Sequence, residues 1–199
     1  MLAVEERTAI GEEELLRARV YGLLGRYLAT PPDAAQLRLT ATLTGDESDF
    51  GRAIGALSHA AASTTAESAA EEYQDIFIGV GRGEVVPFAS YYLTGFLHEK
   101  PLAELRIDMS KLGIAPAPSV GDPEDHIASL CECMAGMIAG EYRADLETQH
   151  RFFNAHIASW AIRFFSDLEK AANAKLYRAV GAVGRLFLTV EQTAFAMTE

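Results

Sequence analysis

The sequence predicts an all-α protein, a single helical domain of about ten helices in two halves joined by a hinge rich in proline and glycine. Two observations predict this fold class. Apolar residues recur at three- and four-residue steps over most of the 199 residues, which is the spacing of one face of a helix. No alternating stretch is long enough to indicate a strand. A composition of 49% hydrophobic and 23% charged residues is ordinary for one compact domain of this length.

The first predicted helix covers residues 15–28, where leucines, a valine and a tyrosine form one apolar stripe. It ends before a pair of prolines at 31 and 32, because the residue before a proline disfavours the helical conformation. A short second helix follows Asp33, which suits the N-cap, and a third is expected to open at residue 49 and pass through residue 57. Residues 60–65, rich in alanine, serine and threonine, are expected to be a connection.

A further helix is predicted from Ala66 up to the glycine-rich residues 79–83. Glycine readily takes the left-handed conformation that follows a helix, so these glycines are expected to end it. A short helix over residues 88–97 comes next. Another begins at Pro101, a residue favoured in the first helical turn, and extends through residue 112.

The clearest interruption of the helical pattern is the segment 113–121, in which two prolines lie between glycines. It is interpreted as a hinge between an N-terminal helical half, 1–112, and a C-terminal helical half, 122–199, within one domain, 1–199. Three helices are expected in the second half, over residues 122–142, 146–172 and 174–197. Asp122 is the expected N-cap of the first of these, with Asp125 placed to reach back as in a capping box.

Residues that could support catalysis, metal binding or nucleotide binding lack the necessary patterns, so neither an enzyme nor a bound cofactor is predicted. The glycines at 79–83 match neither the dinucleotide nor the phosphate-loop pattern. Cys131 and Cys133 lie about 200° apart on a helix, and no histidine–cysteine spacing indicates a zinc site. A hydrolase using His126 with Asp125 remains as an alternative, although no nucleophile accompanies the pair.

The net charge of −11 disfavours nucleic acid as a partner and is compatible with a basic ligand. The first residues combine no basic segment with an apolar one, so no signal peptide is expected. No apolar run approaches the roughly 20 residues that cross a bilayer, so direct membrane insertion is not expected either. The predicted location is the cytoplasm, a reducing compartment in which two cysteines would stay as free thiols.

Two motifs distinguish this chain from other helical proteins. The first reads Tyr73-x-x-Ile76-Phe77-x-Gly79-x-Gly81 and continues as Pro87-Phe88-x-Ser90-Tyr91-Tyr92. The second reads Asp122-Pro123-x-Asp125-His126. Together they resemble the TorD/DmsD family of chaperones. In that family a tryptophan is frequent where Phe88 stands, and a glutamate where Asp122 stands.

The resemblance implies a cytoplasmic chaperone that binds the twin-arginine signal peptide of a molybdenum-cofactor oxidoreductase and delays export until the cofactor is inserted. Its partners would be the leader and the folded body of that enzyme. The chain would be a monomer, or a dimer that exchanges halves across the hinge. Eight residues are expected near an apolar groove that binds the leader: Tyr21, Tyr73, Phe77, Pro87, Phe88, Tyr91, Asp125 and His126.

One other non-catalytic interpretation fits the same sequence. A NarJ-like protein, or another helical assembly or regulatory protein with a different client, would have the same helical composition. The client itself cannot be read from one chain, so both interpretations stay open at this stage.

Overall fold

The computed structural model of the protein describes residues 10–115 and 121–197. Within these ranges it contains ten α-helices and one π-helical turn, η1, which covers Gln74–Ile78. The only extended pairing described there is a single isolated bridge between Phe88 and His126. The predicted all-α class is confirmed. The helices are α1 (Glu12–Ala29), α2 (Ala34–Thr40), α3 (Asp49–Ala62), α4 (Ala66–Tyr73), α5 (Ala89–Thr94), α6 (Lys100–Lys111), α7 (Ile127–Ile138), α8 (Leu146–His156), α9 (Ala161–Lys170) and α10 (Leu176–Ala196).

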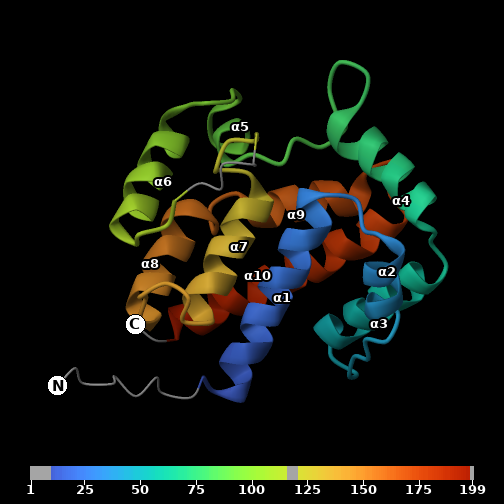
Figure 1. The fold of residues 1–199 in the computed structure, drawn as a ribbon, viewed down its shortest axis with the longest axis horizontal. Coiled ribbons are helices and arrows are strands. Elements are labelled where there is room, and N and C mark those ends of the chain that lie inside the picture. The colour runs from blue at the N-terminus through green and yellow to red at the C-terminus, as the bar shows by residue number, and fades with distance from the viewer. Residues whose placement is uncertain (1–9, 116–120, 198–199) are drawn as a thin grey trace.

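Helices α1 and α7 lie side by side in front of α9 and α10 (Figure 1). Helices α2, α3 and α4 lie at one end of the molecule, and α5, α6 and α8 lie at the other. The contact between α1 and α7 is close, because a methyl group added to Gly25 would lie 3.4 Å from the carbonyl oxygen of Ala128. The two helices therefore join the N-terminal half of the sequence to the C-terminal half.

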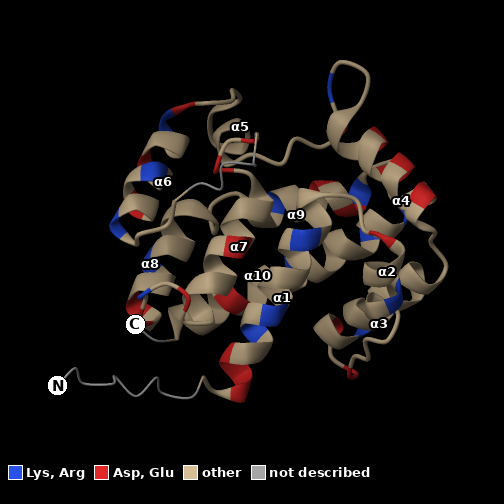
Figure 2. Cartoon of the chain, in the orientation of Figure 1, with Lys and Arg blue, Asp and Glu red and all other residues tan. Residues whose placement is uncertain are grey.

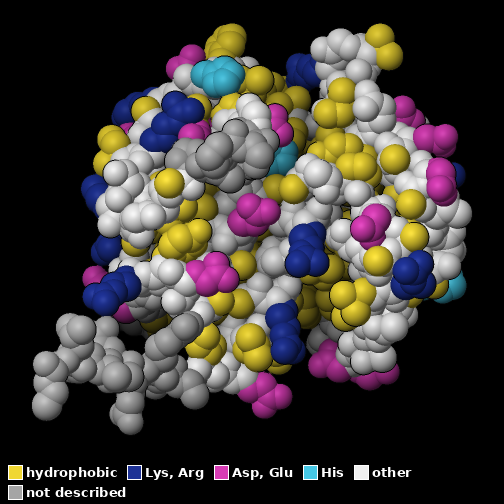
Figure 3. Space-filling model, viewed as in Figure 1, with side chains coloured by type: hydrophobic (Ala, Val, Ile, Leu, Met, Phe, Trp, Pro, Cys, Tyr) yellow, Lys and Arg dark blue, Asp and Glu magenta, His cyan; other side chains and the backbone are white. Residues whose placement is uncertain are grey.

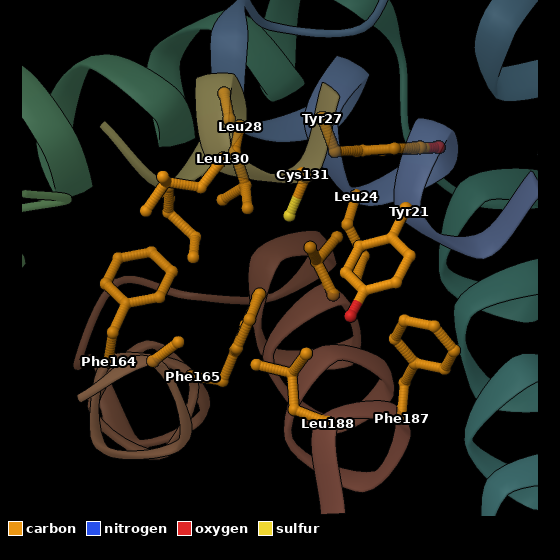
Figure 4. Packing of buried hydrophobic residues seen from close by; sticks show 14 of the residues in the cluster. Tyr21, Leu24, Tyr27, Leu28, Leu130, Cys131, Phe164, Phe165, Phe187 and Leu188 are labelled. Carbon is orange, nitrogen blue, oxygen red and sulfur yellow. The ribbon is translucent and has the colours of Figure 1, made fainter. Parts of the chain in front are cut away.

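A single hydrophobic core contains side chains from both halves. In Figure 4 residues of α1 and α7 point toward residues of α9 and α10. The labelled members are Tyr21, Leu24, Tyr27 and Leu28 of α1, Leu130 and Cys131 of α7, Phe164 and Phe165 of α9, and Phe187 and Leu188 of α10. Since these helices come from opposite ends of the chain, neither half can bury its apolar face without the other.

The first three helices follow the prediction with one correction. Helix α1 ends at Ala29, just before the two prolines, and the Asp33 carboxylate accepts a hydrogen bond from the backbone N–H of Gln36 at the start of α2. Helix α3 is capped by the Ser48 hydroxyl, and it continues to Ala62. The prediction that residue 60 begins a connection was therefore wrong, because small residues are compatible with the last helical turn.

Residues 146–172, predicted as one helix, form two helices separated at 157–160. The backbone of Ile157 leaves the helical conformation, and the indole N–H of Trp160 donates to the carbonyl oxygen of His156 at 2.7 Å. Trp160 is fully buried. The break allows this large side chain to enter the core, and that packing outweighs the continuous helical pattern.

Helix α7 begins at Ile127 and is capped by His126, so the predictions of an N-cap at Asp122 and a capping box at Asp125 were wrong. The N–H of Ile127 donates to the carbonyl oxygen of Pro87 at 2.9 Å, and the N–H of Ala89 donates to the backbone carbonyl oxygen of Asp125 at 3.0 Å. These bonds hold the segment before α7 in an extended pairing with another part of the chain, which excludes a helical start at Asp122.

The hinge predicted at 113–121 is described only in part, because residues 116–120 lie outside the described ranges. Helix α6 ends at Lys111, and Gly113 has a left-handed φ of 72°. The division into two halves on either side of this segment stays a prediction. No helix in the described part of the chain combines the length and apolar character that crossing a membrane requires.

Candidate functional site

The structure brings the two sequence motifs together into one local unit. The bridge between Phe88 and His126 aligns the segment before α5 with the segment before α7. Figure 2 shows acidic positions in the segment that leads into α7, next to α5. The aromatic part of the first motif and the acidic part of the second therefore lie beside each other, although Ser90 of the first and Asp125 of the second are 35 residues apart in sequence.

Asp125 is almost completely buried, with 1% of its surface exposed. Its Oδ2 atom accepts from the backbone N–H of Ser90 at 2.8 Å and from the Ser90 hydroxyl at 2.5 Å. The carboxylate thus caps the N-terminus of α5, where N–H groups have no partner within the helix. Its Oδ1 atom is buried and has no hydrogen-bond partner among the described residues. Asp125 therefore fixes α5 against the second motif and does not face solvent.

His126 caps its own helix, because its Nδ1 atom accepts from the backbone N–H of Ala128 at 3.1 Å. The neutral ring must then carry its hydrogen on Nε2. Its ring lies edge-on to Phe88, with centroids 4.9 Å apart. Burial lowers the pKa of His126 to about 4, and the carboxylates of Asp122 and Asp125 only partly oppose this effect. The ring is uncharged at neutral pH and positions Phe88.

Tyr73 connects this unit to the end of α1. Its hydroxyl lies 3.2 Å from the carbonyl oxygen of Leu28 and 3.1 Å from that of Ala29, so it donates to the end of the helix. Burial raises the pKa of Tyr73, and the charge of Asp122 raises it further. The Tyr73 hydroxyl is therefore within electrostatic range of the second motif. The Tyr73 ring is half-buried and packs against Phe77, with centroids 4.9 Å apart.

The other predicted site residues differ in how accessible they are. Tyr21 is fully buried, and its hydroxyl donates to Glu191 of α10 at 3.1 Å. Phe77 and Pro87 are buried, while Phe88 and Tyr91 are half-buried. The eight residues thus form no single exposed surface: some present atoms to solvent, and others support them from inside the molecule.

Hydrophobic side chains also gather at the surface near this unit. Figure 3 shows them on the face below the loop that follows α4. Large apolar residues are exposed at the end of η1, on that loop, and within and after α5: Ile78, Val80, Leu93, Phe96 and Leu97. Asp122 adds an exposed carboxylate, whereas the nearby Glu124 accepts from Arg106 at 2.8 Å. This part of the chain thus exposes both apolar groups and a carboxylate, a combination that suits a segment that is both basic and apolar.

Sequence reasoning missed a group of charged residues around Tyr91 and Tyr92. The Tyr92 hydroxyl donates to the Asp167 carboxylate at 2.9 Å, and Arg82 and Arg163 lie over the two tyrosine rings. Asp167 is 75 residues away from Tyr92, so no local pattern could have indicated the contact. In the described ranges, no cluster of three or more histidine, cysteine or acidic residues could hold a metal ion.

Comparison with known proteins identifies the family. The model of the nitrate reductase delta subunit family matches residues 44–166, which include all of the first motif and the second. This chain belongs to that family. A chaperone protein TorD from Aliivibrio fischeri is 30% identical over 103 residues, covering 47% of this chain and 48% of the relative. A "Probable Tat proofreading chaperone DmsD" from Haemophilus influenzae is 31% identical over 112 residues, covering 55% of this chain and 53% of the relative.

The matches to these relatives confirm the resemblance to the TorD/DmsD family and the prediction of a non-catalytic family. The chain spans about half the length of the relatives that it matches. A solved structure of a candidate redox enzyme maturation protein from Archaeoglobus fulgidus is 19% identical, with a TM-score of 0.58, over 93% of this chain and 99% of that chain. The similarity to this structure supports the fold.

Proposed function

We propose that this protein is a cytoplasmic maturation chaperone that binds the twin-arginine signal peptide of a molybdenum-cofactor oxidoreductase. Binding would hide the leader and delay export until the cofactor is inserted. The observation that carries the proposal is the pairing of the two family motifs through Phe88 and His126. Relatives named TorD and DmsD support the same class of function.

The chemistry of a twin-arginine leader fits the surface around this bridge. Such a leader joins a basic segment to an apolar one. The half-buried rings of Tyr73, Phe88 and Tyr91 offer apolar contact with polar groups at the edge, and Asp122 offers a carboxylate for an arginine. Asp125, His126 and Pro87 would hold these groups in place, while Tyr21 and Phe77 would support them from the core.

The partners follow from this role. The leader and the folded body of the client enzyme would both contact the protein, which would act as a monomer. An exchange of halves across the predicted hinge at 113–121 would give a dimer with the same sites.

The first experiment measures binding of a labelled twin-arginine leader and of a copy in which both arginines are alanine. The wild-type protein is expected to bind the intact leader about tenfold more tightly than the copy, since two charge-assisted contacts are lost. Asp122→Asn should weaken binding of the intact leader and leave binding of the copy unchanged. Phe88→Ala should weaken both, whereas Leu39→Ala, which removes an exposed leucine on α2, serves as the matched control. Equal binding of the two peptides would exclude recognition of the arginines.

A second candidate function is favoured by the description of the family as the nitrate reductase delta subunit. A NarJ-like assembly protein would act on a cytoplasmic client whose leader is a remnant. In that case a remnant peptide without paired arginines should bind as tightly as an intact leader does, and Asp122→Asn should have no effect on either peptide.

A further inference from the structure

Tyr91 and Tyr92, which follow each other on α5, are each covered by an arginine of the protein itself. The guanidinium carbon of Arg82 lies 4.7 Å from the centre of the Tyr91 ring, and that of Arg163 lies 5.9 Å from the centre of the Tyr92 ring. An N–H of Arg82 also donates to the Tyr91 hydroxyl. The two rings meet edge to face, 5.9 Å apart. This part of α5 therefore already binds guanidinium groups.

A pocket with a volume of about 300 Å³ lies beside these rings, and two carboxylates line it. Asp167 accepts from the Tyr92 hydroxyl, and Glu84 accepts from the backbone N–H of Ala172 at 2.6 Å. A carboxylate can accept several hydrogen bonds, so each can still receive N–H groups from a ligand. Aromatic faces combined with carboxylates are the groups that bind a guanidinium best.

The two arginines are held differently. Arg163 belongs to α9, and one of its N–H groups donates to the carbonyl oxygen of Tyr92 at 3.0 Å. Arg82 belongs instead to the loop of residues 79–84, which projects from the body of the molecule in Figure 1 and carries a fully exposed Val80. Arg82 is therefore the arginine that can leave its ring without disturbing a helix.

We infer that the pocket lined by Tyr91, Glu84 and Asp167 is a guanidinium site, and that Arg82 occupies the place of one arginine of a bound peptide. The inference rests on the proposed function, because the ligand is an arginine of the leader. Replacement of Arg82 by that arginine keeps the charge of the pocket constant, since one guanidinium substitutes for another beside Lys170. Arg82 thus lowers the affinity for a peptide whose arginine must displace it from the Tyr91 ring, and does not affect a peptide that binds elsewhere.

The test measures leader affinity for wild type, Arg82→Ala, Tyr91→Leu and the double variant that combines these substitutions. Arg82→Ala removes the internal competitor and should tighten leader binding about threefold, the order expected for one exposed cation–π contact. The gain should disappear in the Tyr91→Leu background and with the leader copy that lacks both arginines. In a Tyr91→Phe background, which keeps the aromatic ring, Arg82→Ala should still tighten leader binding. Arg38→Ala, which removes an exposed arginine on α2, is the matched control and should change nothing.

The outcomes separate this inference from the function on which it rests. If wild type binds the leader and Arg82→Ala leaves affinity unchanged or lowers it, the guanidinium site is refuted and the chaperone function stands. If neither wild type nor Arg82→Ala binds any twin-arginine leader, both are refuted. If only Arg82→Ala binds, both are supported, with Arg82 a stronger competitor than expected.

Discussion

Asp125 and His126 act in the structure as helix caps. Asp125 caps α5 from a distant part of the sequence, and His126 caps α7 from the adjacent position. Both side chains are buried, so under the proposed function they would act on a ligand only through the residues that they position, Phe88 above all. A substitution at either residue is therefore expected to change stability as well as leader binding.

The buried neutral ring of His126 should make the folded protein less stable in acid. Its pKa is about 4 in the folded state and 6.5 when unperturbed, so between these values the unfolded state takes up a proton that the folded state does not. The contribution of His126 is complete above pH 6.5 and is lost as the pH falls toward 4, to a total of about 3 kcal/mol. Denaturant titrations at several pH values between these limits measure it.

The control variant for this prediction is His126→Asn, which keeps an acceptor at the N-cap and cannot titrate. The comparison uses the slope of the unfolding free energy against pH, because loss of the ring also removes packing against Phe88. A slope in the variant equal to that of wild type would show that His126 is not the titrating group.

At the level of elements, the turn η1 and the glycine loop determine where the first motif can lie. The N–H of Gly79 donates to the carbonyl oxygen of Gln74 at 2.7 Å. The N–H of Val85, beyond the loop, donates to the carbonyl oxygen of Ile76 at 2.9 Å. Gly79 has a left-handed φ of 62°. The chain therefore leaves η1, forms the loop that carries Arg82, and comes back to the same helical end before it reaches the bridge.

The return of the loop requires a glycine at position 83. A methyl group there would lie 2.4 Å from the carbonyl oxygen of Phe77 and 2.7 Å from that of Ile76, and both are backbone atoms. Gly83→Ala should therefore lower the free energy of unfolding by about 1–3 kcal/mol, as overpacking does elsewhere. Urea denaturation measures the loss.

Gly22→Ala is the matched substitution for this experiment, because nothing lies within 4 Å of the added methyl group on α1. It should raise the stability by about 0.5–1 kcal/mol. Equal effects of the two substitutions would mean that the close approach at Gly83 does not constrain the loop.

At the scale of the whole molecule, the N-terminal and C-terminal halves share one core and one buried ion pair. Arg17 of α1 donates to Glu191 of α10 at 2.7 Å, and both side chains are largely shielded from water. Glu191 also accepts the hydroxyl of Tyr21. Removal of either half would expose the core. Loss of the Arg17 side chain alone would leave the Glu191 charge buried without its partner, which costs about 3–5 kcal/mol for such pairs.

The protein should therefore unfold in a single cooperative transition. Far-UV circular dichroism reports on all helices, whereas fluorescence of the single tryptophan, Trp160, reports on the buried junction between α8 and α9. The two signals should give the same midpoint in urea. A fluorescence midpoint clearly different from that of circular dichroism would indicate halves that unfold separately.

Residue spacing along the chain was enough to predict the all-α class, the end of α1 before two prolines, the cap at Asp33 and the family motifs. These features depend on interactions within one or two helical turns, which residue spacing encodes directly. The same local patterns gave the wrong cap at Asp122. They do not include the backbone hydrogen bonds to Pro87 and Ala89 that hold this segment in an extended conformation.

Contacts between residues far apart in the sequence depend on how the helices pack. The Asp125 carboxylate reaches Ser90, Arg82 covers Tyr91, and Glu72 of α4 accepts the N–H of Lys175 just before α10, at 2.7 Å and 103 residues away. Each of these contacts needs the helices to be packed first, because the core fixes the distance between segments that the sequence leaves independent. The accessibility of each predicted site residue is determined by that same packing.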